Sequence, residues 1–256
     1  MARDRLQQCI QGPRLVVNRH QQRCLVAPAR THVLIADHQK TGRVVGVVLD
    51  VGDQDREAVL ERSFSSGVEC LVSIGSGYGI GGNASAIALA ETDDRIFATV
   101  GVHPHEASEL DDENREAIRA WLAHERVVAL GECGLDYFRN FSPREAQLHA
   151  FRAQLEIAAS TGLPVFLHQR DAHDDFVEVL EPMLPKIPRA VAHCFTGEHE
   201  SLREYLAMGL WIGITGWICD ERRGKHLHDI VGDVPDDRLM IETDAPYLLP
   251  RTLEPK

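Results

Sequence analysis

Eight short β-type runs alternate with helical segments along residues 44–241, and this alternation constrains the fold more than any other feature of the sequence. Most of the runs are rich in Val, Ile and Leu and lack polar alternation, as expected of parallel strands buried on both faces. The runs are Val44–Val51, Cys70–Ile74, Phe97–Val102, Val127–Leu130, Pro164–Leu167, Ala190–Ala192, Leu210–Ile214 and Leu239–Ile241. Strands that alternate with helices form a parallel sheet, so we predict an α/β protein.

Helix-start signals lie between these runs. Ser142-Pro-Arg-Glu145 is a candidate capping box, and the acidic residues Asp111, Asp112 and Glu113 suit the first turn of another helix. Eight strands within residues 44–256 fit a (βα)8 TIM-type barrel better than an open doubly wound sheet. No G-x-G-x-x-G motif and no P-loop follows a strand, which disfavours a dinucleotide-binding or nucleotide-phosphate fold.

Charge and composition limit the class of protein. The chain has 256 residues and a net charge of −12, which argues against a protein that coats nucleic acid through bulk charge but permits an enzyme that meets phosphates at a local site. No apolar run approaches the ~20 residues of a membrane span. The six cysteines lack C-x-x-C spacing, which disfavours a zinc finger or a disulfide framework. We therefore expect a cytoplasmic monomer with no membrane segment.

Residues 1–43 differ in composition from the rest of the chain. They carry eight basic and two acidic residues, show no steady helical or strand period, and lack the apolar region of a secretory signal. We predict two parts: a basic, poorly ordered extension over residues 1–43 and a barrel domain over residues 44–256.

Five of the predicted strands end in side chains that suit catalysis or metal binding. These side chains are His103, His105, Glu132, His168, Arg170, His193, Glu242 and Asp244. A lone histidine at such an end is more often a packed rim residue, but five successive endings of this kind are hard to obtain by chance. Because the carboxyl ends of all strands of a barrel meet at one mouth, we expect these side chains to converge there.

The combination of Glu, His and Asp suits a divalent ion such as Mg²⁺, Mn²⁺ or Zn²⁺, and the absence of thiolates disfavours structural zinc. One or two such ions would activate water and polarise a phosphoryl or carbonyl oxygen. Asp244 is suited both to hold an ion and to accept a proton from the attacking water. His103 and His105 are suited to contact the substrate or a second ion, and Arg170 is suited to bind phosphate.

Five motifs between residues 47 and 256 resemble those of the TatD family of metal-dependent deoxyribonucleases, in order and with similar spacing. They are Gly101-Val-His-Pro-His105, Gly131-Glu-Cys-Gly-Leu-Asp136, His193-Cys-Phe-Thr-Gly197, Gly213-Ile-Thr-Gly-Trp-Ile-Cys-Asp-Glu-Arg-Arg-Gly224 and Glu242-Thr-Asp-Ala-Pro-Tyr-Leu248. The resemblance implies a TIM-type barrel that acts with Mg²⁺ as a 3′-to-5′ exonuclease on single-stranded DNA and RNA, with a link to DNA repair. It also implies metal ligands at Glu132, His168, His193 and Asp244, with His103 and Glu242 lining the site. We accordingly expect Asp244, His103 and Glu242 to be catalytic, and His105 and Arg170 to bind substrate.

Two features depart from the family pattern. Many members carry a His-x-His pair on the first strand, whereas here Leu49-Asp50-Val51-Gly52 runs straight into Asp53, and His38 is a candidate for a displaced remnant. The chain also ends soon after the eighth predicted strand, so we expect a barrel that is incomplete there. Two alternatives stay open: an amidohydrolase-type metal-dependent hydrolase of a small molecule, and a catalytically inactive truncated barrel.

Other residues near the motifs have weaker claims. Aromatic residues that are candidates for stacking on bases, although packing is their commoner role, are Tyr137, Phe195 and Trp217. Arginines that are candidates for binding phosphate, or are simply surface residues, are Arg139, Arg222 and Arg223. Asp136 and Asp171 either orient the histidines or cap loops. Strand alternation turns Cys194 away from the side that His193 faces, which predicts a packing role for this cysteine.

Overall fold

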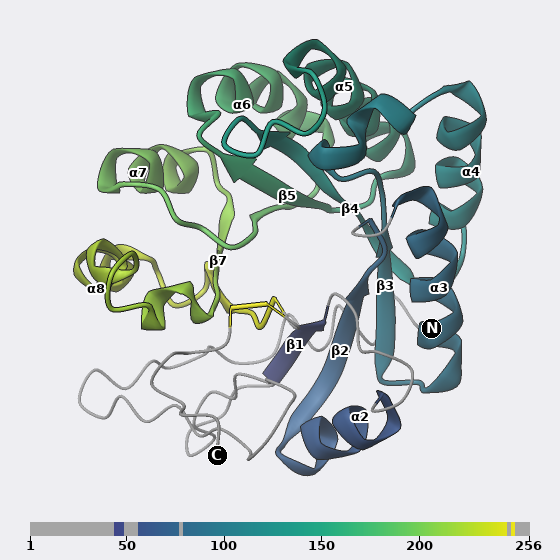
Figure 1. The fold of residues 1–256 in the computed structure, drawn as a ribbon, viewed down its shortest axis with the longest axis horizontal. Coiled ribbons are helices and arrows are strands. Elements are labelled where there is room, and N and C mark those ends of the chain that lie inside the picture. Colours follow the sequence, from purple (N-terminus) through teal and green to yellow (C-terminus); the bar gives the residue numbers. More distant parts are fainter. Residues whose placement is uncertain (1–43, 49–55, 77–78, 245–246, 249–256) are drawn as a thin grey trace.

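A computed structural model describes residues 44–48, 56–76, 79–244 and 247–248, with residues 44–48 described by their backbone alone. Within these residues, eight parallel strands form one sheet in the order β1 to β8, which curls around an axis with helices α2 to α8 on its outside (Figure 1). The strands are β1 (Val44–Val48), β2 (Val68–Ile74), β3 (Ile96–Val100), β4 (Val127–Asp136), β5 (Val165–Arg170), β6 (Ala190–Ala192), β7 (Trp211–Ile214) and β8 (Leu239–Ile241). The prediction of a TIM-type barrel is confirmed.

One or more helices follow each of the first seven strands. The α-helices are α2 (Arg56–Ser65), α3 (Gly79–Thr92), α4 (Asp112–Leu122), α5 (Arg144–Thr161), α6 (His173–Leu180), α7 (His199–Ala207) and α8 (Lys225–Ile230). The 3-10 helices are η1 (Pro104–Glu109), η2 (Glu181–Lys186), η3 (Gly216–Cys219) and η4 (Val231–Asp233). Stacked aromatic rings join neighbouring helices in the outer layer: Phe151 of α5 lies 5.4 Å from Phe176 of α6, measured between ring centroids.

The helix-start signals gave one correct and one wrong prediction. Asp111 is the N-cap of α4, and its side chain accepts a hydrogen bond from the backbone N–H of Asn114 at 2.8 Å, as expected. The capping box at Ser142 does not form, because the Ser142 hydroxyl donates instead to the carbonyl of His105 at 2.8 Å. Ser142 therefore ties the start of α5 to the loop after β3 rather than closing the helix.

Buried amide side chains on the helices hold the carboxyl ends of β3 and β4. Gln147 and Gln154 lie seven residues apart, two turns along the same face of α5. Gln154 bonds both the N–H and the carbonyl of Val102, at 2.7 and 3.0 Å. Gln147 does the same for Asp136, at 2.8 and 3.1 Å. Because each amide satisfies a donor and an acceptor, the backbone beside His103 and at Asp136 is fixed from outside the barrel.

A register shift in β4 places Glu132 at the mouth. Gly131 pairs with Phe166 and Cys133 pairs with Leu167, so Glu132 is the extra residue of a bulge. Its backbone N–H donates to the Ser76 hydroxyl at 2.9 Å. Because of the bulge, the backbone N–H of Glu132 is paired with the side chain of Ser76, which follows β2, instead of with a neighbouring strand.

Parts of the prediction concern residues that the structure does not describe. The described residues do not include the predicted basic extension over residues 1–43, which contains His38. They also leave out the end of the first predicted strand, the loop after it, and the last eight residues, where we expect an incomplete barrel. Within the described part, no helix is long and apolar enough to cross a membrane.

Candidate metal and catalytic site at the barrel mouth

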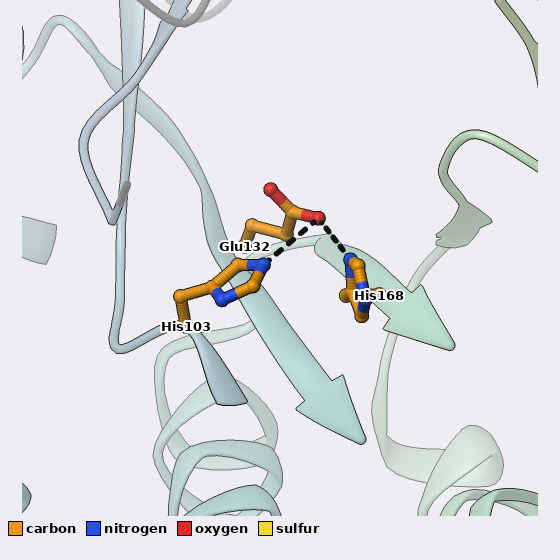
Figure 2. Close-up of side chains that lie close together, drawn as sticks. All are labelled: His103, Glu132 and His168. Carbon is orange, nitrogen blue, oxygen red and sulfur yellow. Dashed lines mark hydrogen bonds and ion pairs between the residues drawn. The ribbon is translucent and has the colours of Figure 1, made fainter. Parts of the chain in front are cut away.

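The side chains predicted to converge do lie together at the carboxyl end of the barrel. His103 follows β3, Glu132 lies in β4, His168 in β5, His193 follows β6, and Asp244 follows β8. Figure 2 shows three of them, with the His103 and His168 rings facing the Glu132 carboxylate from either side.

The four predicted metal ligands form one continuous line of contacts. Glu132 Oε1 lies 2.7 Å from His168 Nδ1 and 3.9 Å from His193 Nε2, and His193 Nε2 lies 3.2 Å from Asp244 Oδ1. Two groups of potential ligand residues adjoin along this line, and the ligand atoms within each group lie within 4.8 Å of one another. The groups are His103 with Glu132 and His168, and His193 with Cys194 and Asp244. Four strand ends that are far apart in sequence thus present a compact set of nitrogen and oxygen donors.

Glu132 is buried and ionised. Burial on its own raises the pKa of a carboxyl group, but the facing His193 and His103 rings and the hydrogen bond from His168 outweigh burial and hold the pKa of Glu132 well below its usual range. One carboxylate oxygen therefore carries a negative charge toward three imidazole rings.

His103 is a neutral ring with a defined hydrogen position. Its Nδ1 accepts a hydrogen bond from the backbone N–H of His105 at 3.2 Å, and its Nε2 lies 3.7 Å from Glu132 Oε1. Burial lowers the pKa of His103 to about 4, despite the opposing charge of Glu132. A neutral ring that accepts at Nδ1 carries its hydrogen on Nε2, so His103 presents an N–H donor to the mouth.

His168 lies between two carboxylates. Nδ1 contacts Glu132, and Nε2 lies 3.2 Å from Asp136 Oδ2. Burial opposes protonation of this ring, but the hydrogen bonds to Asp136 and Glu132 outweigh it and raise the pKa of His168 to about 9. Asp136 also accepts from His105 Nε2 at 2.8 Å and from the backbone N–H of Arg139 at 2.7 Å. Asp136 thus both orients histidines and caps its loop, whereas Asp171 is exposed.

The buried carboxylate of Glu242 orients the His193 ring. Glu242 Oε2 accepts from His193 Nδ1 at 2.9 Å and from the backbone N–H of Cys194 at 3.0 Å, and the carboxylate is fully buried. This bond turns Nε2 of His193 toward Glu132 and Asp244. Burial lowers the pKa of His193, but Glu242 and Glu132 outweigh it and raise the pKa well above its usual range. The arrangement needs Gly213, because a Cβ there would collide with the Glu242 carboxylate.

The prediction for Cys194 was wrong. Strand β6 ends at Ala192, and Cys194 has a φ of +45°, so strand alternation does not apply to it. Its Sγ lies 3.2 Å from the Thr215 hydroxyl and belongs to the same group of potential ligands as His193 and Asp244. Burial raises the pKa of Cys194 to about 12, so the sulfur is a thiol while no metal is bound.

The two predicted substrate-binding residues occupy the rim. His105 contacts Asp136, and its ring lies 4.8 Å from the exposed ring of Phe141. The Arg170 guanidinium lies over the ring of Phe138, with Cζ 4.0 Å from the ring centroid. Sequence reasoning missed Phe138, Phe141 and Ser76. The two phenylalanines could have been found in the sequence, because they are large apolar residues in the otherwise polar loop that follows the Gly131–Asp136 motif.

Residues 38–256 match the family model described as TatD related DNase. The chain belongs to this family. Among curated relatives, the 3′-5′ ssDNA/RNA exonuclease TatD of Enterobacter lignolyticus is 50% identical, over 79% of this chain and 77% of that protein. The protein of the same name from Musicola paradisiaca is 51% identical, over 80% and 77%. Among solved structures, the TatD homologue YJJV of Escherichia coli K12 has a TM-score of 0.73 and 30% identity, with 80% of each chain covered. The similarity to TatD-family proteins thus includes the segments that carry the site.

Proposed function

We propose that this protein is a metal-dependent exonuclease that removes nucleotides from the 3′ end of single-stranded DNA or RNA. The observation that carries the proposal is the continuous line from His168 through Glu132 and His193 to Asp244 at the barrel mouth. Family membership and relatives named as 3′-5′ ssDNA/RNA exonucleases support the same activity. The two histidines of the line are each held by a buried carboxylate outside it, Asp136 for His168 and Glu242 for His193, which argues against an inactive barrel.

The donor set fits a divalent ion. Glu132, Asp136 and Glu242 are buried carboxylates and Asp244 is partly buried, and among the described residues Oε1 of Glu242 has no hydrogen-bond partner. Buried negative charges are costly unless a cation offsets them. Imidazole nitrogen with carboxylate oxygen suits Mg²⁺, Mn²⁺ or Zn²⁺. We assign Glu132, His168, His193 and Asp244 as the ligands, with Mg²⁺ as the physiological ion and room for one or two ions.

The remaining chemistry follows from the positions of the side chains. When bound, a divalent ion supplies Lewis-acid activation of the phosphoryl group and of the attacking water. Asp244 is a partly buried carboxylate at the β8 end of the line and would accept the proton of that water. His103 donates its Nε2 hydrogen to a phosphate oxygen of the substrate. The hydrogen bond from His193 Nδ1 to Glu242 would leave Nε2 as the nitrogen that binds an ion.

The polarity of digestion tests the proposed function. With Mg²⁺ present, a single-stranded oligonucleotide labelled at its 3′ end is expected to release labelled mononucleotide at once. The same oligonucleotide labelled at its 5′ end is expected to give a ladder of shortening products. EDTA is expected to stop both reactions. Labelled mononucleotide released first from the 5′ end, or cleavage unaffected by EDTA, would contradict the proposal.

Metal affinity is expected to increase with pH. In the metal-free protein the pKa of His168 is about 9, so this ring holds a proton at pH 7 that a metal must displace. The affinity should therefore rise between pH 7 and pH 9, by up to about tenfold per pH unit for each proton displaced. Calorimetric titration with Mn²⁺ in two buffers of different ionisation enthalpy measures the protons released. An affinity that is constant over this range, with no proton release, would rule out His168 as a ligand.

A further inference from the structure

Exposed aromatic side chains lie at the carboxyl end of the barrel. Within the described residues, the large hydrophobic side chains that are exposed are Phe138, Phe141 and Tyr247, with exposed fractions of 56%, 67% and 57%. The first two follow β4 and the third follows β8, so all three lie at the end of the barrel that carries the site. Phe138 and Phe141 share one loop, and exposed apolar side chains that lie together indicate a binding surface rather than chance exposure.

Arginines interleave with aromatic rings on this rim. Arg170 Cζ lies 4.0 Å from the centroid of the Phe138 ring and 5.6 Å from that of the Trp217 ring, and Arg223 Cζ also lies 5.6 Å from the Trp217 centroid. Trp217 lies in η3 and is partly exposed. The order along the rim is therefore Phe138, Arg170, Trp217 and Arg223, which we call the rim row.

The rim row adjoins the candidate site. Arg170 is two residues beyond His168 in β5, so both side chains leave the strand on the same face. Asp136 pairs with Arg170 in the register of β4 and β5, and Phe138 follows Asp136 by two residues. A chain whose end reaches Glu132 and Asp244 therefore has the rim row within a few residues' reach.

We propose that the rim row is a stacking surface for the nucleobases that lie next to the cleaved end of a single strand, and this inference rests on the proposed function. Aromatic faces accept every base, and an arginine plane between two rings pairs with phosphate while it stacks. The arginines stand out because the chain as a whole has a net charge of −12. The stacking surface binds unpaired bases only, since the faces of paired bases are covered by their neighbours in the duplex.

Leucine variants separate stacking from mere apolar packing. Phe138→Leu and Trp217→Leu keep a hydrophobic side chain but remove the flat ring. The matched control is Trp211→Leu, because Trp211 also has two arginines near its ring, Arg189 and Arg238, but lies at the amino end of β7, away from the mouth. Each rim variant is expected to lower kcat/KM on a single-stranded oligonucleotide about tenfold, and the control less than twofold.

Abasic substrates complete the test. A series of oligonucleotides, each with one abasic nucleotide at successive positions from the 3′ end, is expected to show a loss of kcat/KM for the wild type at the stacked positions. The rim variants should show no further loss at those positions, because the lost ring and the lost base remove the same contact. Equal losses in wild type and variants at every position would overturn the stacking surface.

Binding without cleavage keeps this test independent of the proposed function. Fluorescence anisotropy of a 5′-labelled single strand in EDTA measures affinity alone. A wild type that binds tenfold more tightly than both rim variants supports the stacking surface, even where no oligonucleotide is cleaved and the proposed function fails. Affinities that are the same in the wild type and both rim variants, with cleavage intact, would overturn the stacking surface and leave the exonuclease standing. A wild type that neither binds nor cleaves single strands would overturn both.

Discussion

Replacing Glu132 with glutamine is expected to lower kcat for nucleotide release by about 10³-fold, the scale on which a preorganised electrostatic contact acts. The reason is geometric, because Glu132 Oε1 is the atom that faces His103, His168 and His193 at 3.7, 2.7 and 3.9 Å. Glutamine keeps the size of the side chain but removes the charge that both the rings and a divalent ion require. The variant changes no apolar contact of the core, so cooperative thermal unfolding should be retained.

The matched control for this change is Glu156→Gln, since Glu156 is exposed on the outer side of α5. Steady-state kinetics with saturating Mg²⁺, alongside circular dichroism melts, compare the two variants with the wild type. A Glu132→Gln protein that folds and retains kcat within a few-fold of the wild type would refute the central position of Glu132.

Replacing Gly213 with alanine is expected to lower activity about 100-fold, although Gly213 contributes no functional group. The added Cβ would occupy the position of the Glu242 carboxylate, which holds His193 Nδ1 and the Cys194 N–H. Displacing Glu242 leaves His193 free to rotate, and misplacement by about 1 Å can cost 10²-fold in rate. Loss of a partner that orients a ligand also weakens metal binding by about 10–100-fold. The variant should therefore need more Mg²⁺ for half-maximal rate.

Gly232→Ala is the control for Gly213→Ala, because a Cβ at position 232 meets no atom within 4 Å. The rate of each variant is measured across a Mg²⁺ titration. If Gly213→Ala keeps the wild-type rate and the same half-saturating Mg²⁺ concentration, Glu242 does not act by orienting His193.

The sequence predicted the barrel and the convergence of polar side chains at its carboxyl end, for a physical reason. Parallel strands inside a ring of helices are apolar, so Ala190–Ala192 and Leu239–Ile241 were predicted with their observed bounds. Polar side chains that follow such strands lie at the carboxyl end of the barrel, which is why His193 and Asp244 were singled out from the sequence pattern.

The second layer of contacts was harder to predict, since it depends on where the regular pattern breaks. The bulge at Glu132 and its bond to Ser76 arise from a register shift that composition does not encode. The positive φ of Cys194 turned a residue expected to pack away from the site toward it. The capping box at Ser142 failed because a tertiary partner, the carbonyl of His105, competes for the hydroxyl.

The most direct test of the account is nucleotide release from a 3′-labelled single-stranded oligonucleotide by the wild type and Asp244→Asn, each with Mg²⁺ and with EDTA. Asparagine suits this position because the backbone φ of Asp244 is +57°, a conformation that asparagine tolerates. We predict nucleotide release only from the wild type with Mg²⁺. The wild type with EDTA, and Asp244→Asn under either condition, should give no release above background. Release by Asp244→Asn at the wild-type rate, or release by the wild type in EDTA, would contradict a metal-dependent nuclease site at the barrel mouth.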